Sequence, residues 1–207
     1  MNFQLIIKRV FDITISLMGL VIFIIPVFLI MILMKLKSKG PIFFKQERPG
    51  KNGKIFNIYK LRTLQETYDK NGHLLPDKDR MTRIGRFLRR FSLDELPELW
   101  NILKGDMSFV GPRPLLVAYL KRYTPEQARR HEMKPGITGW AQINGRNAIT
   151  WEEKFRYDVW YVDHWNFWLD TKIICITLFK VIKGEGVSQF GHATIEEFKG
   201  SDPNGKQ

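Results

Sequence analysis

The sequence predicts an α+β protein in which an apolar N-terminal helix enters a membrane and a small, mostly helical domain follows. Three observations lead to this fold class. Apolar residues crowd into the first fifth of the chain, two strand-like runs come next, and helical periodicity dominates the remainder. With 207 residues, the chain has the length of one ordinary domain with an appendage.

Composition narrows the class of protein. Charged residues make up 26% and hydrophobic residues 44% of the chain, so it can bury a core and is not a disordered tail. The single cysteine, Cys175, excludes a disulfide framework and a site built from several thiolates. The net charge of +12, placed around and after the apolar stretch, favours a basic domain on a membrane surface.

The apolar stretch Ile13–Met34 has no charged residue, and as a helix it would rise about 33 Å, close to the thickness of the hydrocarbon core. Pro26 lies inside it, and a proline there kinks or breaks a helix. Lys8 and Arg9 precede the stretch and a lysine-rich segment, residues 35–39, follows it, so the positive-inside rule holds both ends on one side. A kinked spanning helix and a re-entrant helix bent at Pro26 both agree with this pattern.

A β-hairpin is expected over residues 41–60. Apolar runs at residues 42–44 and 55–59 flank a turn-rich segment at residues 48–53 that contains Pro49 and two glycines. The polar residues 65–80 are expected to form a surface loop or a short pair of helices.

Two helices are expected next, over residues 82–91 and 96–103. Arginines line one face of the first, which indicates either a solvated face or a footprint for phosphate. The second ends at Gly105, which suits a C-cap, and it begins at either Ser92 or Asp94 as N-cap.

The sequence also contains groups suited to phosphate chemistry. Asp94 and Glu95 are adjacent carboxylates near a helix start, where they serve as caps or as chemical groups. Arg113 is held between two prolines, so we expect its guanidinium to be aimed at a partner. A glycine-rich segment around Arg146 would let the backbone approach an anion. Because no zinc-ligand spacing or serine nucleophile motif is present, these residues are the candidates for chemistry, and they suit phosphoryl transfer.

The C-terminal third is expected to be helical and rich in aromatic residues. We expect helices over residues 124–132 and 173–182, and five of the six tryptophans lie between residues 140 and 168. Trp151 is expected in the core, whereas Trp165 and Trp168 suit either the core or the membrane interface.

Several long motifs resemble the bacterial sugar transferases, the monotopic polyprenol-phosphate phosphoglycosyl transferases. The main match is residues 92–114, SLDELPELWNILKGDMSFVGPRP. Shorter matches are KR and FD at residues 8–12, QERPG at 46–50, YKLRT at 59–63 and PGITGWAQ at 135–142. The resemblance covers nearly the whole chain in order.

The resemblance implies that the chain transfers a sugar 1-phosphate from a UDP-sugar to undecaprenyl phosphate and releases UMP. Asp94 would attack the β-phosphate to form a covalent phosphosugar intermediate and would bind Mg²⁺, while Glu95 would assist with metal or proton handling. Arg113 would hold substrate phosphate. Further phosphate partners or polar site members would be Arg86, Lys60, Arg62, Arg146 and Asp158.

The resemblance also implies a domain organisation. Residues 1–36 would form a re-entrant membrane anchor broken at Pro26, residues 37–200 a catalytic domain with amphipathic interfacial helices, and residues 201–207 a flexible tail. The catalytic domain would lie on the cytoplasmic face of the bacterial inner membrane, in contact with membrane lipids. No nucleic-acid partner is expected, and a homodimer is left open.

Two points weigh on the resemblance. The family often has Ser-Pro at the membrane break, whereas Ile25 precedes Pro26 here and cannot satisfy a backbone carbonyl at the bend. The C-terminal motifs at residues 186–198 are similar to those of transferases that begin glycoconjugate assembly with an N-acetylated amino sugar such as N,N'-diacetylbacillosamine. The alternative function is a basic membrane-surface adaptor without catalysis.

Overall fold

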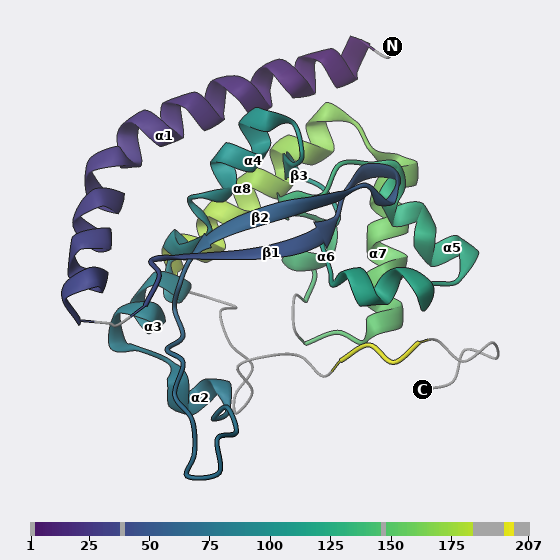
Figure 1. Cartoon of the computed structure of the whole chain (residues 1–207). Helices are drawn as coiled ribbons and strands as arrows, with labels where there is room; N and C mark the ends of the chain where they lie inside the picture. Colours follow the sequence, from purple (N-terminus) through teal and green to yellow (C-terminus); the bar gives the residue numbers. More distant parts are fainter. Residues whose placement is uncertain (1–2, 38–39, 146–147, 184–196, 201–207) are drawn as a thin grey trace.

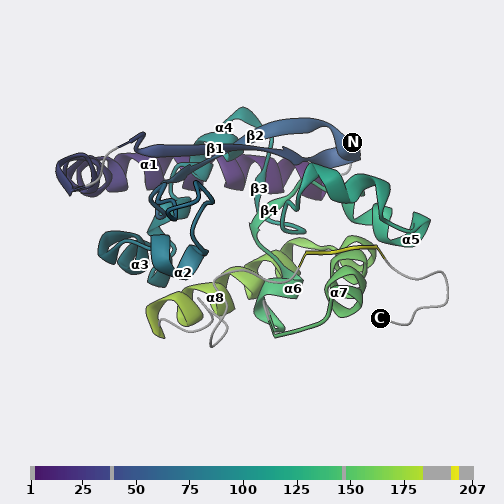
Figure 2. The same ribbon diagram turned by 60° about the horizontal axis from the view of Figure 1, so that its bottom comes forward.

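A computed structural model describes residues 3–37, 40–145, 148–183 and 197–200. Figure 2 shows two layers, with the long helix α1 and the hairpin β1–β2 in one and helices α6, α7 and α8 in the other. The mixture of helices and a small hairpin confirms the α+β class. The expected tail, residues 201–207, lies outside the described residues.

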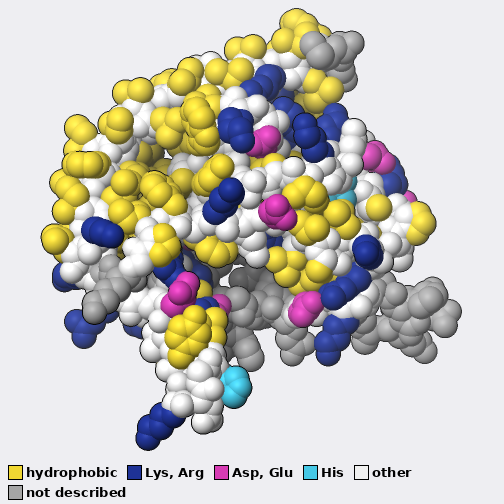
Figure 3. Space-filling model, viewed as in Figure 1, with side chains coloured by type: hydrophobic (Ala, Val, Ile, Leu, Met, Phe, Trp, Pro, Cys, Tyr) yellow, Lys and Arg dark blue, Asp and Glu magenta, His cyan; other side chains and the backbone are white. Residues whose placement is uncertain are grey.

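Helix α1 runs from Phe3 to Lys37. It remains helical across Pro26, so a break at that residue is not seen, although its ribbon turns from one direction to another partway along (Figure 1). Figure 3 shows hydrophobic side chains along the length of α1 on the outside of the molecule. Only 6% of the most apolar 18-residue stretch of α1 is buried, so α1 is not a core helix. The helix is also long and apolar enough to cross a membrane.

The N-terminal part of α1 is fastened to the domain by a buried ion pair. The Nζ atom of Lys8 lies 2.5 Å from Oδ2 of Asp170 and donates to the carbonyl oxygen of Val110 at 2.9 Å. Asp170 also accepts from the hydroxyl of Tyr161 at 2.7 Å and from Nε1 of Trp165 at 3.1 Å. Lys8 was expected to belong to a basic flank of the apolar stretch, but its ammonium is buried in the protein and paired with Asp170.

Arg9 and Asp12 extend this attachment. The guanidinium of Arg9 donates to the carbonyl oxygens of Ile102 and Leu103 at 2.6 and 2.7 Å, where helix α4 ends and its carbonyls need donors. Oδ1 of Asp12 accepts from the backbone N–H of Phe109 at 3.0 Å. These contacts assign structural roles to the motif at residues 8–12.

The expected hairpin is confirmed, with longer strands than the apolar runs suggested. Strand β1, Phe43–Pro49, pairs antiparallel with β2, Ile55–Leu61, so that Phe43 lies opposite Leu61. A single 3₁₀ turn, Lys51–Gly53, closes the hairpin.

Three helices follow: α2, Asp77–Arg80; α3, Arg83–Arg90; and α4, Glu98–Lys104. Gly105 ends α4 with a φ of 91°, which confirms the expected C-cap. Both expected N-caps of this helix are wrong. Ser92 adopts a left-handed conformation and Asp94 lies in a 3₁₀ turn, Leu93–Glu95, so α4 begins only after Pro97 and neither side chain caps it.

A two-stranded parallel sheet lies in segments for which no strand is expected from the sequence. Strand β3, Ser108–Val110, pairs with β4, Gly136–Thr138. The backbones approach so closely that a Cβ on Gly136 would lie 2.1 Å from the backbone nitrogen of Gly111. This contact places the loop that carries Arg113 beside the loop that contains Gly136.

The second layer consists of α6, Trp140–Ile143, α7, Trp151–His164, and α8, Phe167–Lys183. The helix expected at residues 124–132 is α5, Pro125–Ala128, followed by a 3₁₀ turn, Arg129–Glu132. Another 3₁₀ turn covers Val117–Lys121. Trp151 is half-buried and packs on Phe155, Trp165 bonds to Asp170, and Trp168 is 81% exposed.

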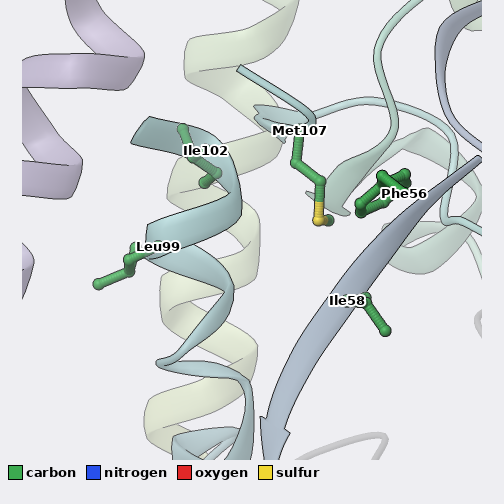
Figure 4. Close-up of a cluster of buried hydrophobic side chains, with 5 residues drawn as sticks. All are labelled: Phe56, Ile58, Leu99, Ile102 and Met107. Carbon is green, nitrogen blue, oxygen red and sulfur yellow. The ribbon is translucent and has the colours of Figure 1, made fainter. Parts of the chain in front are cut away.

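Part of the core lies between the hairpin and α4. Figure 4 shows its five buried side chains, Phe56, Ile58, Leu99, Ile102 and Met107. Asn101, fully buried in α4, accepts from the backbone N–H of Tyr59 at 3.2 Å and donates to the carbonyl oxygen of Asn57 at 2.7 Å. Its amide therefore fastens β2 to α4.

Replacing Asn101 by alanine is expected to destabilise the protein by about 2–3 kcal/mol, because both backbone groups lose their partner. Thermal unfolding of the detergent-solubilised protein measures this change. The control is Asn144→Ala, which removes an exposed amide bonded to the carbonyl of Trp140. Equal unfolding temperatures for the two variants would contradict the role given to Asn101.

Candidate active site

A cleft of about 720 Å³ opens beside the hairpin, the Asp94 turn and α7. It is lined by six residues selected from the sequence: Asp94, Glu95, Arg113, Lys60, Arg62 and Asp158. Arg86 is exposed on α3 and does not line the cleft, and Arg146 lies outside the described residues. On α3, it is Arg89 that lines the cleft, where its Nε donates to the hydroxyl of Thr63 at 2.9 Å.

Glu95 is held by two cations. Its Oε1 lies 2.7 Å from Nζ of Lys60 and 2.5 Å from Nη2 of Arg113. Burial alone would raise the pKa of Glu95, but Arg113 and Lys60 outweigh burial and hold this pKa well below its usual range. Glu95 is therefore an ionised anchor for the two cations, and the partner expected for Arg113 is found.

Asp94 stands in a different environment. It is 9% exposed, and its carboxylate makes no hydrogen bond or ion pair with any residue in the described part of the chain. Burial and the neighbouring Glu95 raise the pKa of Asp94, against the opposing effect of Lys60, Arg89 and Arg113. The two adjacent carboxylates thus differ. Glu95 is held by two ion pairs, whereas Asp94 is available to contact a ligand.

Glu98 is a third carboxylate at this site. It is fully buried in α4, with its Oε1 3.0 Å from Nζ of Lys60. Burial raises its pKa, Lys60 opposes that shift and Glu95 adds to it, which leaves the pKa of Glu98 at about 7.

The pKa of Glu98 makes stability depend on pH. Since the ordinary pKa is 4.5, the folded protein holds a proton that the unfolded chain has lost between about pH 4.5 and 7. The free energy of unfolding is therefore expected to fall as the pH rises through this window. Glu98→Gln imitates the protonated group and should remove this contribution to the pH dependence of stability. The unfolding temperature of the variant, relative to that of the wild type, should therefore rise by several degrees between pH 5 and pH 8.

Thermal unfolding at four pH values within this range makes the measurement. The control is Glu126→Gln, which changes an exposed side chain paired with Arg129. Its unfolding temperature should depend on pH in the same way as that of the wild type. A constant difference between Glu98→Gln and the wild type at every pH would contradict the prediction.

A buried arginine, Arg130, positions the backbone of Arg113. Arg130 donates from Nη2 to the carbonyl oxygen of Arg113 at 2.8 Å. It also donates to Oδ2 of Asp158 from Nη2 at 2.6 Å and from Nε at 3.0 Å. Asp158 was selected from the sequence as a site member, and its carboxylate acts on Arg113 through Arg130.

Sequence reasoning missed three cations and an amide that belong to this region: Arg89, Arg130, Lys154 and Gln142. The family resemblance implied Arg86 as a phosphate partner on the arginine-lined helix, whereas the packing of α3 turns Arg89 to the cleft. Lys154 and Asp158 are four residues apart on α7, a spacing that could have indicated a shared face.

A divalent cation was expected at Asp94. In the described ranges, no group of three or more His, Cys, Asp or Glu side chains is arranged to hold a metal ion. Mg²⁺ often needs only one or two carboxylates, with water and substrate phosphates completing its shell. The free carboxylate of Asp94 fits that donor set.

A long apolar helix and a cleft of fixed cations around a free carboxylate define a membrane-associated protein suited to phosphoryl chemistry. Residues 3–184 match the sequence profile of the bacterial sugar transferases. The chain belongs to this family, as its motifs predicted, and it is a sugar-phosphate transferase.

Three relatives illustrate the similarity. The uncharacterized sugar transferase EpsL of Bacillus subtilis is 55% identical over 197 residues, which is 95% of this chain and 98% of the relative. The galactosyl transferase CpsE of Streptococcus agalactiae is 43% identical, over 88% of this chain and 44% of the relative. The UDP-glucose:undecaprenyl-phosphate glucose-1-phosphate transferase of Escherichia coli is 39% identical, over 84% of this chain and 39% of the relative. The chain thus spans nearly all of EpsL but less than half the length of the other two.

Proposed function

We propose that this protein transfers a sugar 1-phosphate from a UDP-sugar to undecaprenyl phosphate, releases UMP and begins the assembly of a glycoconjugate on the membrane. The named activity of the Escherichia coli relative supports this reaction class. The observation that carries the proposal is the contrast between two carboxylates. Asp94 is buried without a hydrogen-bond or ion-pair partner among the described residues, whereas Glu95 is fixed by Lys60 and Arg113.

In the proposed reaction, Asp94 is the nucleophile. Its carboxylate attacks the β-phosphorus of the donor, and the covalent phosphosugar is later transferred to the acceptor. Lys60 and Arg113 are held in place by Glu95, so their charge is already oriented when negative charge develops on the phosphate. Arg89 and Arg62 add positive charge along the same cleft.

Mg²⁺ is the proposed metal. Asp94 would hold it together with the substrate phosphates, and when bound it would neutralise phosphate oxygens.

The membrane arrangement proposed for α1 is a re-entrant one, with the bend at Pro26 and both ends on the cytoplasmic face of the bacterial inner membrane. Support comes from the two ends of α1, which pack against the same domain. Near the N-terminus, Lys8 pairs with Asp170, and near the C-terminus, Met34 packs with Leu61 and Leu88. A helix whose ends lay on opposite sides of a bilayer could not make both contacts.

Cysteine labelling in intact cells tests this arrangement. In a Cys175→Ser background, Phe3→Cys and Leu36→Cys, both at exposed ends of α1, are expected to react only after the cytoplasmic membrane is permeabilised. Reaction of either cysteine with an impermeant reagent in intact cells would contradict the re-entrant arrangement.

The donor sugar is tested by a panel of UDP-sugars with undecaprenyl phosphate, monitored for UMP release. The panel contains UDP-glucose and UDP-galactose, since relatives are named for these sugars, and N-acetylated amino sugars, which the C-terminal motifs favour. We expect UMP release with at least one donor, and the donor used identifies the sugar. Release of UMP from none of them, with lipid binding retained, would favour the adaptor function.

A further inference from the structure

Lys154 is a buried cation that the proposed mechanism leaves unused. It lies on α7, is 8% exposed and lines the cleft near Asp158. Its Nζ lies 4.2 Å from the centroid of the Trp151 ring. Throughout the ranges that the structure describes, this ammonium has no hydrogen-bond acceptor and no ion pair.

The natural partner of Lys154 is already engaged. Asp158 is one helical turn away on the same face, but its Oδ2 accepts two bonds from Arg130. Burial lowers the pKa of Lys154, Asp158 opposes that shift, and Arg130 and Arg113 add to it, which leaves the pKa at about 8. An ammonium buried without an acceptor is costly, and a bound anion would remove that cost.

The location indicates which anion fits. Lys154 shares the cleft with Asp94 and Arg113, and the charge of Arg113 acts on its ammonium. Phosphate is the anionic group of both substrates in the proposed function, on which this inference rests. Among the described residues, Lys154 forms no ion pair with Asp94 or Glu95, so we assign it to a phosphate other than the one under attack.

We propose that Lys154 forms a subsite for the phosphate that is not under attack: it holds the phosphate of UMP while the donor reacts and then the phosphate of the acceptor lipid.

The stereochemistry of the two steps explains why one subsite serves both substrates. In the first step, an oxygen of Asp94 bonds to the β-phosphorus, and the bond to the bridging oxygen breaks with its electron pair leaving on UMP. In the second step, an oxygen of the acceptor phosphate bonds to the same phosphorus, and the bond to Asp94 breaks with its pair returning to the carboxylate. Because attacking and leaving oxygens lie roughly in line, the acceptor enters where UMP left.

The test compares Lys154→Met and Lys154→Arg with a matched control, Lys172→Met. Lys172 also lies over a tryptophan ring, 5.7 Å from the centroid of Trp140, but it is exposed and outside the cleft lining. The measurements are the dissociation constants of UMP and uridine and the KM for undecaprenyl phosphate, with the full chain in nanodiscs. Thermal unfolding confirms that each variant is folded.

In Lys154→Met, we expect UMP to bind roughly 10- to 100-fold more weakly and the KM for undecaprenyl phosphate to rise by a similar factor, since a charge-assisted bond is lost. Uridine, which has no phosphate, should bind equally to the wild type and to this variant. Lys154→Arg should retain most of the UMP affinity, and Lys172→Met should match the wild type.

Three results would overturn the inference: unchanged UMP binding in Lys154→Met, an equal loss for uridine and UMP, or weaker UMP binding with an unchanged KM for the acceptor. Failure of the proposed function itself would be seen separately, as a wild type that releases no UMP from any donor. UMP binding needs no turnover, so it tests the Lys154 subsite independently.

Discussion

Asp94→Asn is expected to lower the rate of UMP release by at least about a thousandfold, because an amide cannot serve as the attacking carboxylate. The change is nearly isosteric, and Asp94 makes no hydrogen bond within the described residues that the substitution would break. The loss should therefore fall on turnover and not on folding. Steady-state UMP release and thermal unfolding, measured on the same sample, separate the two effects.

A matched control for this prediction lies at the other end of α4. Asp106 is ion-paired with Lys104 at 3.0 Å and does not line the cleft, so Asp106→Asn should keep nearly full activity. Activity of Asp94→Asn close to that of Asp106→Asn would exclude Asp94 as the nucleophile.

Asp170→Ala is expected to destabilise the protein by about 3–5 kcal/mol, because it leaves the Lys8 ammonium buried without its counter-charge. The hydroxyl of Tyr161 and the indole N–H of Trp165 lose an acceptor as well. For a chain of this length, the unfolding temperature should fall by about 10 °C. Tryptophan fluorescence during heating in detergent measures the change.

Two further variants show whether the burial of the Lys8–Asp170 pair causes the loss of stability. Asp163→Ala removes an exposed partner of Arg129 and should cost at most about 1 kcal/mol. The double variant Lys8→Met with Asp170→Leu removes both charges and should recover much of the stability. A loss in Asp170→Ala no larger than in Asp163→Ala would show that this pair does not fasten α1 to the domain.

The sequence predicted elements whose signals are local. The hairpin follows from apolar runs around a Pro-Gly turn, and the end of α4 follows from Gly105, which adopts a left-handed conformation. Arg113 was expected to have a partner because flanking prolines fix its backbone, and its partner is Glu95.

Elements that depend on contacts between distant residues could not be predicted in this way. Strands β3 and β4 have three residues each, too few for a periodic pattern, and they exist because two glycine loops pack together. The burial of Lys8 depends on Asp170, which is 162 positions away. From the sequence alone, the charged residues near the apolar helix indicated only its membrane topology. In the structure, Lys8 also holds this helix to the domain.

The candidate site shows the same division. Asp94 and Glu95 were recognised together, but their difference comes from Lys60, which reaches Glu95 from β2 of the hairpin. The family resemblance selected Arg86 on α3, whereas tertiary packing presents Arg89 to the cleft. Which charges are paired, and which remain free for a ligand, is decided by tertiary structure.

The central claim is that Asp94 carries the sugar phosphate between two substrates. Intact-protein mass spectrometry after incubation with the active UDP-sugar, in the absence of undecaprenyl phosphate, tests it most directly. We expect a mass increase equal to one sugar phosphate, located on the peptide that contains Asp94 and lost when the acceptor is added. UMP release to a full equivalent without any adduct, or an adduct on another residue, would contradict the claim.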